Sequence, residues 1–489
     1  MRLSAQLKTV AVILLAAALF GCKVGPNYKR APVNAPVSFR GAEGAAQQAS
    51  FADLPWWDVF KDDTLKSLVQ QALTNNYDLK IAVTRIEQSR QIAVQARAQL
   101  YPQVSYNGVL SGGKNEFLGT VAPNGGSTQA AFWGALSAAW ELDIWGRIRR
   151  QSEAANAQYL STEQARRGVM LSLVSDVSQA YFELLGLQLQ LEIAKEATKN
   201  FGESLRLFTQ RLEGGVASKL QTSAAAADEA TAAAQIPALE LQIALKENQI
   251  SVLLGENPTG IATVTKLLEE VVPPDLPVGL PSALLERRPD ILAAEQQVAA
   301  ANAQVGVAIA NYFPQIGLTT FFGQGTAPLQ DIASGKATTW SAAAQLTGPL
   351  YRGGALKAAK LQAIAFWDET KLQYEQAALN AFQDVSNALI SRTKYDAIRI
   401  DQQRAVDNYK EAVRIAQLRY NAGKASYYEV LQWQQLLFPA ETSLAQTETN
   451  RRVVIIQLYR ALGGGWNLTD PQWMGNQPQT APAPPAPKP

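Results

Sequence analysis

Two long stretches of the chain repeat apolar side chains at helical spacing, and each turns back on itself at a glycine. The first runs from about 146 to 213 without proline, with Val169, Leu173 and Val177 on one apolar stripe. Its return run is rich in alanine and ends near 254. A helix of about 65 residues would be roughly 100 Å long. That is too long for one compact domain, so the pattern predicts a coiled-coil-like helical assembly.

The same arrangement occurs a second time. A run without proline from 353 to 422 leads to a turn, and its return run ends near 462. Glycine at the end of a helical run supplies a left-handed C-cap, and so short a link forces the two helices to be antiparallel. The two turns lie near 214–218 and 422–426. Their residues are Gly215, Val216, Ala217, Ser218, Gly423, Lys424, Ala425 and Ser426.

The positions of these glycines indicate an internal tandem duplication. Gly215 and Gly423 lie 208 positions apart, and so do Gly255 and Gly463. Independent pairs at one offset are the signature of a repeat. The predicted organisation is a leader at 1–21, an extended segment at 22–61, a first repeat at 62–255, a linker at 256–281, a second repeat at 282–463 and a Pro/Ala-rich tail at 464–489.

Four short segments change to the period of a β-strand. They cover about 103–111, 130–142, 315–322 and 339–347, and each has one apolar and one polar face. Segments of about ten residues with aromatic side chains near their ends are typical of transmembrane β-strands. The alternative is a pair of half-buried hairpins in a soluble domain, which the alternation by itself fits equally well.

The first 22 residues have the features of a bacterial lipoprotein leader. Arg2 and Lys8 precede an apolar run from 10 to 20, which is too short to span a bilayer. The run leads into Leu-Phe-Gly-Cys, which resembles a lipobox and contains the chain's single cysteine, Cys22. We expect Cys22 to be lipidated and to become the first residue of the mature chain; the alternative is an ordinary secretory leader. By resemblance to other bacterial lipoproteins, Lys23 after the cysteine favours the outer membrane.

Composition argues against most enzyme classes and against nucleic-acid partners. Without the leader, 42 Lys and Arg side chains balance 42 Asp and Glu side chains, so no concentrated basic patch for phosphates is expected. The chain has no His and one Cys, which excludes the usual zinc sites, an intramolecular disulfide and His-dependent triads. It also lacks the glycine-rich P-loop motif of nucleotide-binding proteins. We therefore expect no cofactor, no metal site and no catalytic residue.

Three motifs carry a resemblance to a known family. They are the lipobox with the segment Val24–Tyr28, the segment Arg287–Ile291 and the run Arg419–Leu431. With them the chain, from Cys22 to about 465, resembles the TolC-like outer-membrane efflux factors, in the lipoprotein subgroup of OprM and NodT. The resemblance implies an α+β membrane protein: a homotrimer with a tunnel of long antiparallel α-helical hairpins and one 12-stranded β-barrel, to which each chain gives four strands. Four strands alone leave sheet edges that cannot stand in lipid, and twelve is an even number within the bacterial range.

The resemblance also implies a function, which is transport and not catalysis. The protein would be the passive exit duct of a tripartite efflux pump for drugs or small solutes, anchored in outer-membrane lipid. Its partners would be a periplasmic membrane-fusion (adaptor) protein and an inner-membrane transporter of the RND type. One alternative is the outer-membrane duct of a type I protein secretion system. Another is a periplasmic coiled-coil lipoprotein without a pore, which leaves the paired alternating strands unexplained.

In the family, the two helical turns meet the adaptor and form a gate. Tyr420 matches the tyrosine that ties the second tip to polar groups near the first, and Glu429 matches the first acidic position of the mouth. The chain departs from the family pattern at Ala425, Gln432 and Gln221. We expect a hydrogen bond from Tyr420 to Gln221, since an amide both donates and accepts, and a ring of Glu429 that attracts cations. The alternatives are that Tyr420 packs against a neighbouring helix, that Glu429 is merely solvated, and that the tips only make tight turns.

Overall fold

The computed structural model describes most of the chain as two compact units. Its described residues are 23–42, 50–59, 62–114, 116–117, 120–121, 128–269, 277–326 and 334–473. The sheet unit comprises 1–32, 85–163 and 293–375, and the hairpin unit comprises 33–84, 164–292 and 376–489. The expected leader with Cys22, and most of the expected tail, lie outside the described residues.

Helices make up most of the described chain. The four long runs predicted from periodicity are the helices α5, α6, α10 and α11, and their ends lie within two residues of the expected ones. None of the described helices is both long and apolar enough to cross a bilayer. The helices are η1 (Phe51–Asp53), α2 (Trp56–Val59), α3 (Asp63–Asn75), α4 (Tyr77–Ala98), α5 (Arg147–Glu213), α6 (Lys219–Leu253), η2 (Leu267–Glu269), η3 (Pro281–Ala283), α7 (Leu284–Arg287), α8 (Pro289–Ala310), α10 (Ala355–Asn421), α11 (Tyr427–Ala461) and α12 (Asp470–Trp473).

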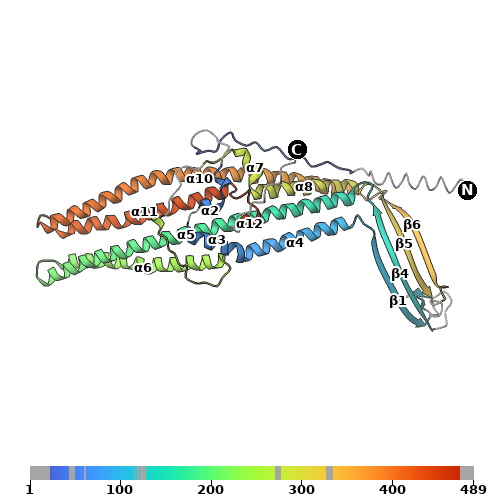
Figure 1. Ribbon diagram of the computed structural model, residues 1–489, viewed down its shortest axis with the longest axis horizontal. Coiled ribbons are helices and arrows are strands. Elements are labelled where there is room, and N and C mark those ends of the chain that lie inside the picture. Colours follow the sequence, from blue (N-terminus) through green and yellow to red (C-terminus); the bar gives the residue numbers. More distant parts are fainter. Residues whose placement is uncertain are drawn as a thin grey trace, which may run out of the picture. The chain divides into compact units, whose positions relative to one another are not determined.

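The sheet unit contains four long antiparallel strands in the order β1-β4-β5-β6, which lie side by side in Figure 1. They occupy the four segments with strand periodicity and are longer than expected by up to four residues at the ends that face the intervening loops. The strands are β1 (Gln103–Lys114), β4 (Thr128–Leu142), β5 (Gln315–Thr326) and β6 (Thr338–Thr347), with a small pair β2 (Glu116–Phe117) and β3 (Thr120–Val121).

One face of this sheet carries a continuous row of apolar side chains. Tyr106 pairs with Leu136, Leu136 with Phe322, and Phe322 with Trp340, so the row crosses all four strands. These four side chains are 58–86% exposed. On the opposite face the hydroxyl groups of Ser105 and its cross-strand neighbour lie 2.8 Å apart. The sheet therefore has one exposed apolar face, as the alternation predicted. The other face mixes serine hydroxyls with the stacked rings of Trp133 and Phe321, whose centroids lie 6.0 Å apart.

Aromatic side chains fix the base of the sheet to the neighbouring helix ends. The Trp140 indole donates to the carbonyl of Leu100 at 2.9 Å, just after α4. The Trp145 indole donates to the carbonyl of Pro314 at 2.9 Å. Its ring stacks on Phe313, with centroids 4.6 Å apart. Indole rings that pack on one side and donate a hydrogen bond on the other suit a boundary between lipid and water.

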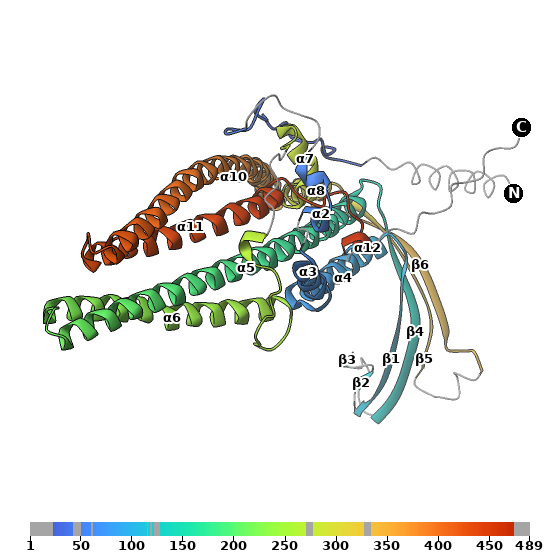
Figure 2. The same ribbon diagram turned by 60° about the vertical axis from the view of Figure 1, so that its left-hand side comes forward.

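The hairpin unit contains two antiparallel helical hairpins, α5 with α6 and α10 with α11 (Figures 1 and 2). Its core begins where the chain enters α3. Asp62 caps that helix by accepting from the backbone amides of Thr64 and Leu65, and it accepts from the buried Tyr181 hydroxyl at 2.6 Å. Burial alone would raise the pKa of Asp62, but these hydrogen bonds hold it below its usual range. The start of α3 is thereby tied to the middle of α5.

Candidate functional site

The first hairpin tip is built from two local capping devices. Gly215 has φ 73°, and the amide of Val216 donates to the carbonyl of Arg211 at 2.9 Å, which is a Schellman cap on α5. The amide of Gln221 donates to the Ser218 hydroxyl, and the Gln221 side-chain oxygen accepts from the Ser218 amide at 2.9 Å. This capping box begins α6. The turn is thus fixed by its own residues.

The second tip has the same backbone cap and a different beginning of its return helix. Gly423 has φ 70°, and the amide of Lys424 donates to the carbonyl of Arg419 at 2.9 Å. Ser426 precedes α11, but its side chain makes no cap hydrogen bond. Glu429, which is 208 positions after Gln221, forms an ion pair with Arg419 at 3.6 Å instead. The Glu429 side chain therefore forms this ion pair and does not take the capping role of Gln221.

A buried cluster joins the two hairpins behind these tips. We call it the tip cluster. Tyr427 lies in it, 5.6 Å from the ring of Phe208 in an edge-to-face contact. The hydroxyl groups of Tyr427 and Ser204 lie 2.9 Å apart in a buried hydrogen bond between α11 and α5. Its buried members are Phe201, Phe208, Ala225, Ala232, Ala416, Tyr427, Val430 and Leu431.

The expected tie between Tyr420 and Gln221 is not present. Among the described residues, Tyr420 makes no hydrogen bond to Gln221, whose oxygen is already engaged in the capping box. The Tyr420 ring instead packs edge-to-face on Tyr427, with centroids 5.0 Å apart, and the Arg211 guanidinium lies 5.2 Å from its centre. Within one chain this hydrogen bond is absent because Gln221 occupies the third helical position, where its amide closes the capping box. The alternative in which Tyr420 packs against a neighbouring helix describes its contacts.

Sequence reasoning missed Tyr427 as the residue that joins the hairpins. It lies inside the run Arg419–Leu431 that carried the resemblance, and a signal was available. Tyr427, Val430 and Leu431 recur at the spacing of one helical face, and all three are buried in the tip cluster. Ser204 could not be found in this way, because a hydroxyl in a long helix is an ordinary residue until its partner is known.

The exposed surface of the tips carries large apolar side chains beside charged ones such as Lys219 and Lys424. Val216 is 76% exposed, Leu220 79% and Tyr428 58%. Leu220 and Tyr428 are equivalent positions of the repeat, 208 apart. Ala217, by contrast, packs against the tip cluster. The surface that a partner can reach is therefore formed by these three larger side chains more than by the small turn residues, a feature that the sequence analysis did not single out.

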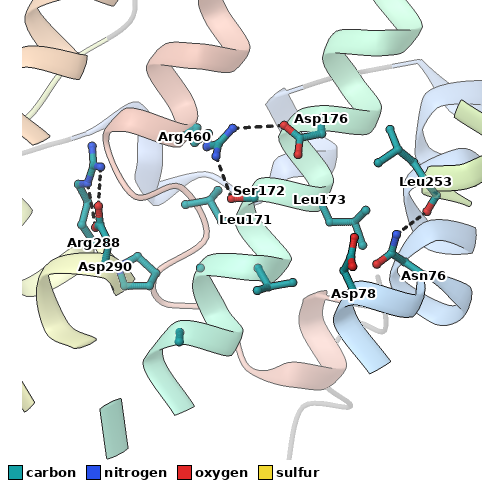
Figure 3. Close-up of a pocket in the computed structure, with 14 residues that line it drawn as sticks. Asn76, Asp78, Leu171, Ser172, Leu173, Asp176, Leu253, Arg288, Asp290 and Arg460 are labelled. Carbon is teal, nitrogen blue, oxygen red and sulfur yellow. Dashed lines mark hydrogen bonds and ion pairs between the residues drawn. The ribbon is translucent and has the colours of Figure 1, made fainter. Parts of the chain in front are cut away.

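At the other end of the hairpins lies a pocket of about 470 Å³, shown in Figure 3. Arg460 donates to Asp176 at 3.2 Å and to the Ser172 hydroxyl at 3.0 Å. Arg288, which also lines the pocket, pairs with Asp290 at 2.7 Å. Its charged groups thus largely satisfy one another, and within the described part of the chain no group of three or more possible ligands could hold a metal ion. The pocket is best described as an ion-paired junction.

Two carboxylates of this junction respond differently to their surroundings. Burial raises the pKa of Asp176, and the Arg460 charge offsets that effect only in part. Burial also opposes ionisation of Asp290, but the hydrogen bonds and charge of Arg288 lower its pKa below the usual range. Arg288 therefore stabilises the ionised form of Asp290 more than Arg460 stabilises that of Asp176.

Comparison with known proteins identifies the family. A family model described as outer membrane efflux protein matches residues 68–256 and 280–464. The solvent efflux pump outer membrane protein SrpC of Pseudomonas putida is 34% identical over 458 residues, which cover 92% of this chain and 97% of SrpC. The chain belongs to the outer membrane efflux protein family. The cation efflux system protein CusC of Escherichia coli is 31% identical over 454 residues, covering 92% of this chain and 97% of CusC.

A solved channel of this family has the same architecture. The open state of the MtrE outer membrane channel of Neisseria gonorrhoeae matches with a TM-score of 0.82 at 29% identity, covering 91% of this chain and 99% of that chain. The resemblance inferred from the sequence is thereby confirmed. This outer membrane efflux protein is a channel of the outer membrane whose helical part is periplasmic, and its family is one of transport proteins.

Proposed function

We propose that three copies of the chain form one passive exit duct, with a twelve-stranded barrel and a helical tunnel. The sheet carries this proposal. β1 and β6 lie at the edges of a four-stranded sheet whose apolar face is exposed from Tyr106 to Trp340. Such edges are not tolerated in lipid, and three sheets can close on one another to give a barrel of bacterial size. The face that carries Ser105 would then line the lumen.

The cargo proposed here is organic. SrpC is named for solvent efflux and CusC for cation efflux. Soft metal cations are carried by thiolate, thioether and imidazole ligands. This chain has no His, one Cys and three Met, so it offers few such ligands. Drugs or small organic solutes, delivered by an RND-type transporter through a periplasmic adaptor, are the cargo that this composition favours.

The domain boundaries and the orientation are part of the same proposal. The leader at 1–21 is removed, Cys22 carries the acyl anchor, and the repeats at 62–255 and 282–463 flank the linker at 256–281. The loops at 112–127 and 323–338, which lie partly outside the described residues, would be extracellular, and the tips periplasmic. A cysteine at Asn124 in a Cys22→Ala background should react with a membrane-impermeant thiol reagent on intact cells. One at Lys424 should react only after the outer membrane is opened; the opposite pattern would overturn the orientation.

Lipidation at Cys22 is tested separately. Cys22→Ala should abolish incorporation of labelled fatty acid, while the barrel can still insert because its apolar belt is an independent membrane signal. Undiminished label in that variant would refute the anchor.

The tips would supply both the gate and the docking surface. The tip cluster holds the two hairpins of each protomer together, and Glu429, in its ion pair with Arg419, would contribute a carboxylate to the narrowed mouth. The exposed Val216, Leu220 and Tyr428 give an adaptor an apolar surface to bury. Opening would then require the second hairpin to move relative to the first, against the contacts of Tyr427.

Two measurements test the duct as a whole. Purified trimers in planar bilayers should conduct, and tagged protein crosslinked in cells should capture an adaptor and an RND-type transporter. Trimers that never conduct would favour a structural lipoprotein without a pore. Capture of an ATP-driven protein exporter in place of the RND transporter would favour the secretion duct.

A further inference from the structure

Arg150, at the start of α5, is a fully buried cation whose hydrogen-bond partners come from a distant part of the chain. Its side chain is 0% exposed. Nε donates to the carbonyl of Val24 at 3.1 Å, and Nη2 donates to the carbonyl of Gly25 at 3.1 Å and to Oδ1 of Asn27 at 2.9 Å. Nη1 donates to both carboxylate oxygens of Glu153, at 3.1 and 3.3 Å. Three of the acceptors thus belong to the extended N-terminal segment 23–30, which we call the strap.

The strap lies so close to α8 that glycines are required on both sides. Gly25 has φ 90°, and a Cβ added there would lie 2.6 Å from the Cα of Gly306. A Cβ at Gly306 would in turn lie 2.8 Å from the Arg150 side chain. Such a fit leaves no room for an alternative path of the strap over this part of α8.

Further contacts continue along α8. The Tyr28 hydroxyl donates to Glu295 at 3.1 Å, and Arg30 pairs with the same carboxylate at 3.1 Å. The strap is therefore held at two places, by a buried cation at one end and by a shared carboxylate at the other.

The upstream end of the strap reaches the base of the sheet. The amide of Val24 donates to the carbonyl of Trp145 at 3.1 Å, and Lys23 pairs with Glu153 at 2.7 Å. Gly146 has φ 79°, and a Cβ there would lie 3.1 Å from the Cα of Lys23. Lys23, the first described residue of the strap, therefore lies beside Trp145 and its stacked partner.

We propose that Arg150 is the receptor for the strap and fixes the point at which an acyl group on Cys22 enters the membrane, beside the base of the sheet. The proposal rests on the proposed lipidation of Cys22. A buried guanidinium that loses three acceptors is strongly disfavoured, so the strap remains docked. A flexible tether of about 20 residues would instead let the lipid range over roughly 25 Å. Docking turns the lipid from a loose tether into a fixed second membrane contact of the barrel.

A photoreactive fatty acid locates the anchor directly. Cells are fed a fatty acid with a diazirine near its carboxyl group, irradiated, and the crosslinked peptides of the purified trimer are mapped. In the wild type, crosslinks within the protein should concentrate at 143–146 and 312–314. In Arg150→Met they should spread over the strands and decrease at these segments by about tenfold. An identical crosslink pattern in both proteins would overturn the proposal.

Proteolysis tests the docking even without the lipid. Trypsin cleaves after Lys29 only when the strap opens, and loss of hydrogen bonds to a charged group should raise the open population about tenfold or more. We expect that increase in Arg150→Met, and a smaller one in Asn27→Ala. Equal cleavage rates in the wild type and both variants would refute the docking of the strap on Arg150. If the wild type takes up no fatty acid, lipidation fails while this assay still reports on Arg150.

A substitution in the strap itself tests the docking without changing Arg150, so the test does not depend on Arg150→Met folding correctly. Gly25→Ala leaves the cation in place but forces the strap off α8, so cleavage after Lys29 should rise. Gly41→Ala is the matched control: Gly41 has φ 88°, and its Cβ would lie 2.8 Å from Ile390, far along the chain from the clamp. It should raise cleavage after Arg40 and leave the Lys29 site protected. An unchanged Lys29 site in Gly25→Ala would contradict the proposal.

Discussion

The two hairpin tips share their backbone and differ in their side-chain ties. Gly215 and Gly423 adopt the same left-handed conformation, and the amides after them bond to equivalent carbonyls. In the first tip, Ser218 and Gln221 close a capping box on their own helix. The side chains of Ser218 and Gln221 therefore serve to begin α6.

The second tip directs its side chains toward other groups. Glu429, at the position equivalent to Gln221, pairs with Arg419, while Tyr427 bonds to Ser204 of the first hairpin. The equivalent arginines also differ. Arg419 pairs with Glu429, whereas Arg211 lies over the ring of Tyr420. The comparison teaches that both copies of the duplication have the same backbone devices for the turn, whereas only the second tip supplies a tyrosine hydroxyl that bonds to the other hairpin.

The largest effect is expected where the two tips are alike, on their exposed apolar surface. Leu220→Glu and Tyr428→Glu would each bury an unpaired charge against an adaptor, at a cost of about 3 kcal/mol or more, which corresponds to over a hundredfold weaker binding. Efflux, measured as accumulation of a fluorescent substrate in cells, should be lost while trimers remain on native gels.

The matched control for this prediction is Val264→Glu, a similar change at an 85% exposed apolar residue of the linker. It should leave efflux unchanged. Full efflux in the Leu220 and Tyr428 variants would show that the tips only make turns. If Leu220→Glu alone abolished efflux, the two tips would not share the docking task.

The next prediction separates the two tyrosines of the second tip. Tyr427→Phe removes the buried hydrogen bond to Ser204, worth about 1 kcal/mol per protomer, so a trimer that opens in concert should gain open probability by up to roughly a hundredfold. Tyr420→Phe should have no such effect, because its contacts are made by the ring. Single-channel recording compares the variants. A larger rise in Tyr420→Phe than in Tyr427→Phe would restore the tie expected from the family pattern.

These two tyrosines show where sequence reasoning stops. Helix lengths and turns followed from periodicity and from glycines such as Gly423, since these are local properties of the backbone. The strands were placed from Pro102 and Pro314 onward, but their outer ends were set too early because Gly113 and Gly325 still pair. Which hydroxyl crosses to the other hairpin depends on packing between helices, and no local pattern encodes it. Arg150 could not be found either, since its strap partners lie over 120 positions away.

A smaller effect is expected for the carboxylate that only the second tip carries. Three copies of Glu429 around one lumen should favour cations, so Glu429→Gln should reduce the cation preference by a few-fold, given that exposed charges are screened within about 10 Å at ordinary salt. Gln221→Glu is the converse change. Its side chain would remain in the capping box, so it should raise the cation preference less than Glu429→Gln lowers it. Reversal potentials in a salt gradient measure both. Unchanged selectivity in Glu429→Gln would place the carboxylate outside the mouth.

The smallest effect is expected at the ion-paired junction, where the two repeats also differ. Arg288 stands where the first repeat has Asn76, at an offset of 212. Each donates to an equivalent carbonyl, Arg288 at 3.1 Å and Asn76 at 3.0 Å. Only Arg288 can also pair with Asp384, at 3.0 Å. Asp176, the equivalent of Asp384, depends on Arg460 instead. The first repeat therefore has the less well compensated carboxylate.

The pH dependence of two asparagine variants should reveal this difference. The pKa of Asp290 is lowered in the folded state through Arg288, so its contribution to stability is present above the usual aspartate pKa near 3.8 and is lost as the pH falls through the lower folded value. The pKa of Asp176 is raised by burial, so its ionised form disfavours folding at neutral pH and that cost disappears on protonation. Both side chains are about half exposed, which limits each effect to under about 1 kcal/mol.

At pH 7, thermal unfolding followed by helical circular dichroism should show Asp290→Asn to be less stable than the wild type and Asp176→Asn to be equal or slightly more stable. As the pH falls below about 3.8, the gap between the two variants should narrow. A gap that stayed constant below that pH would mean that lost packing, and not charge, distinguishes the two variants.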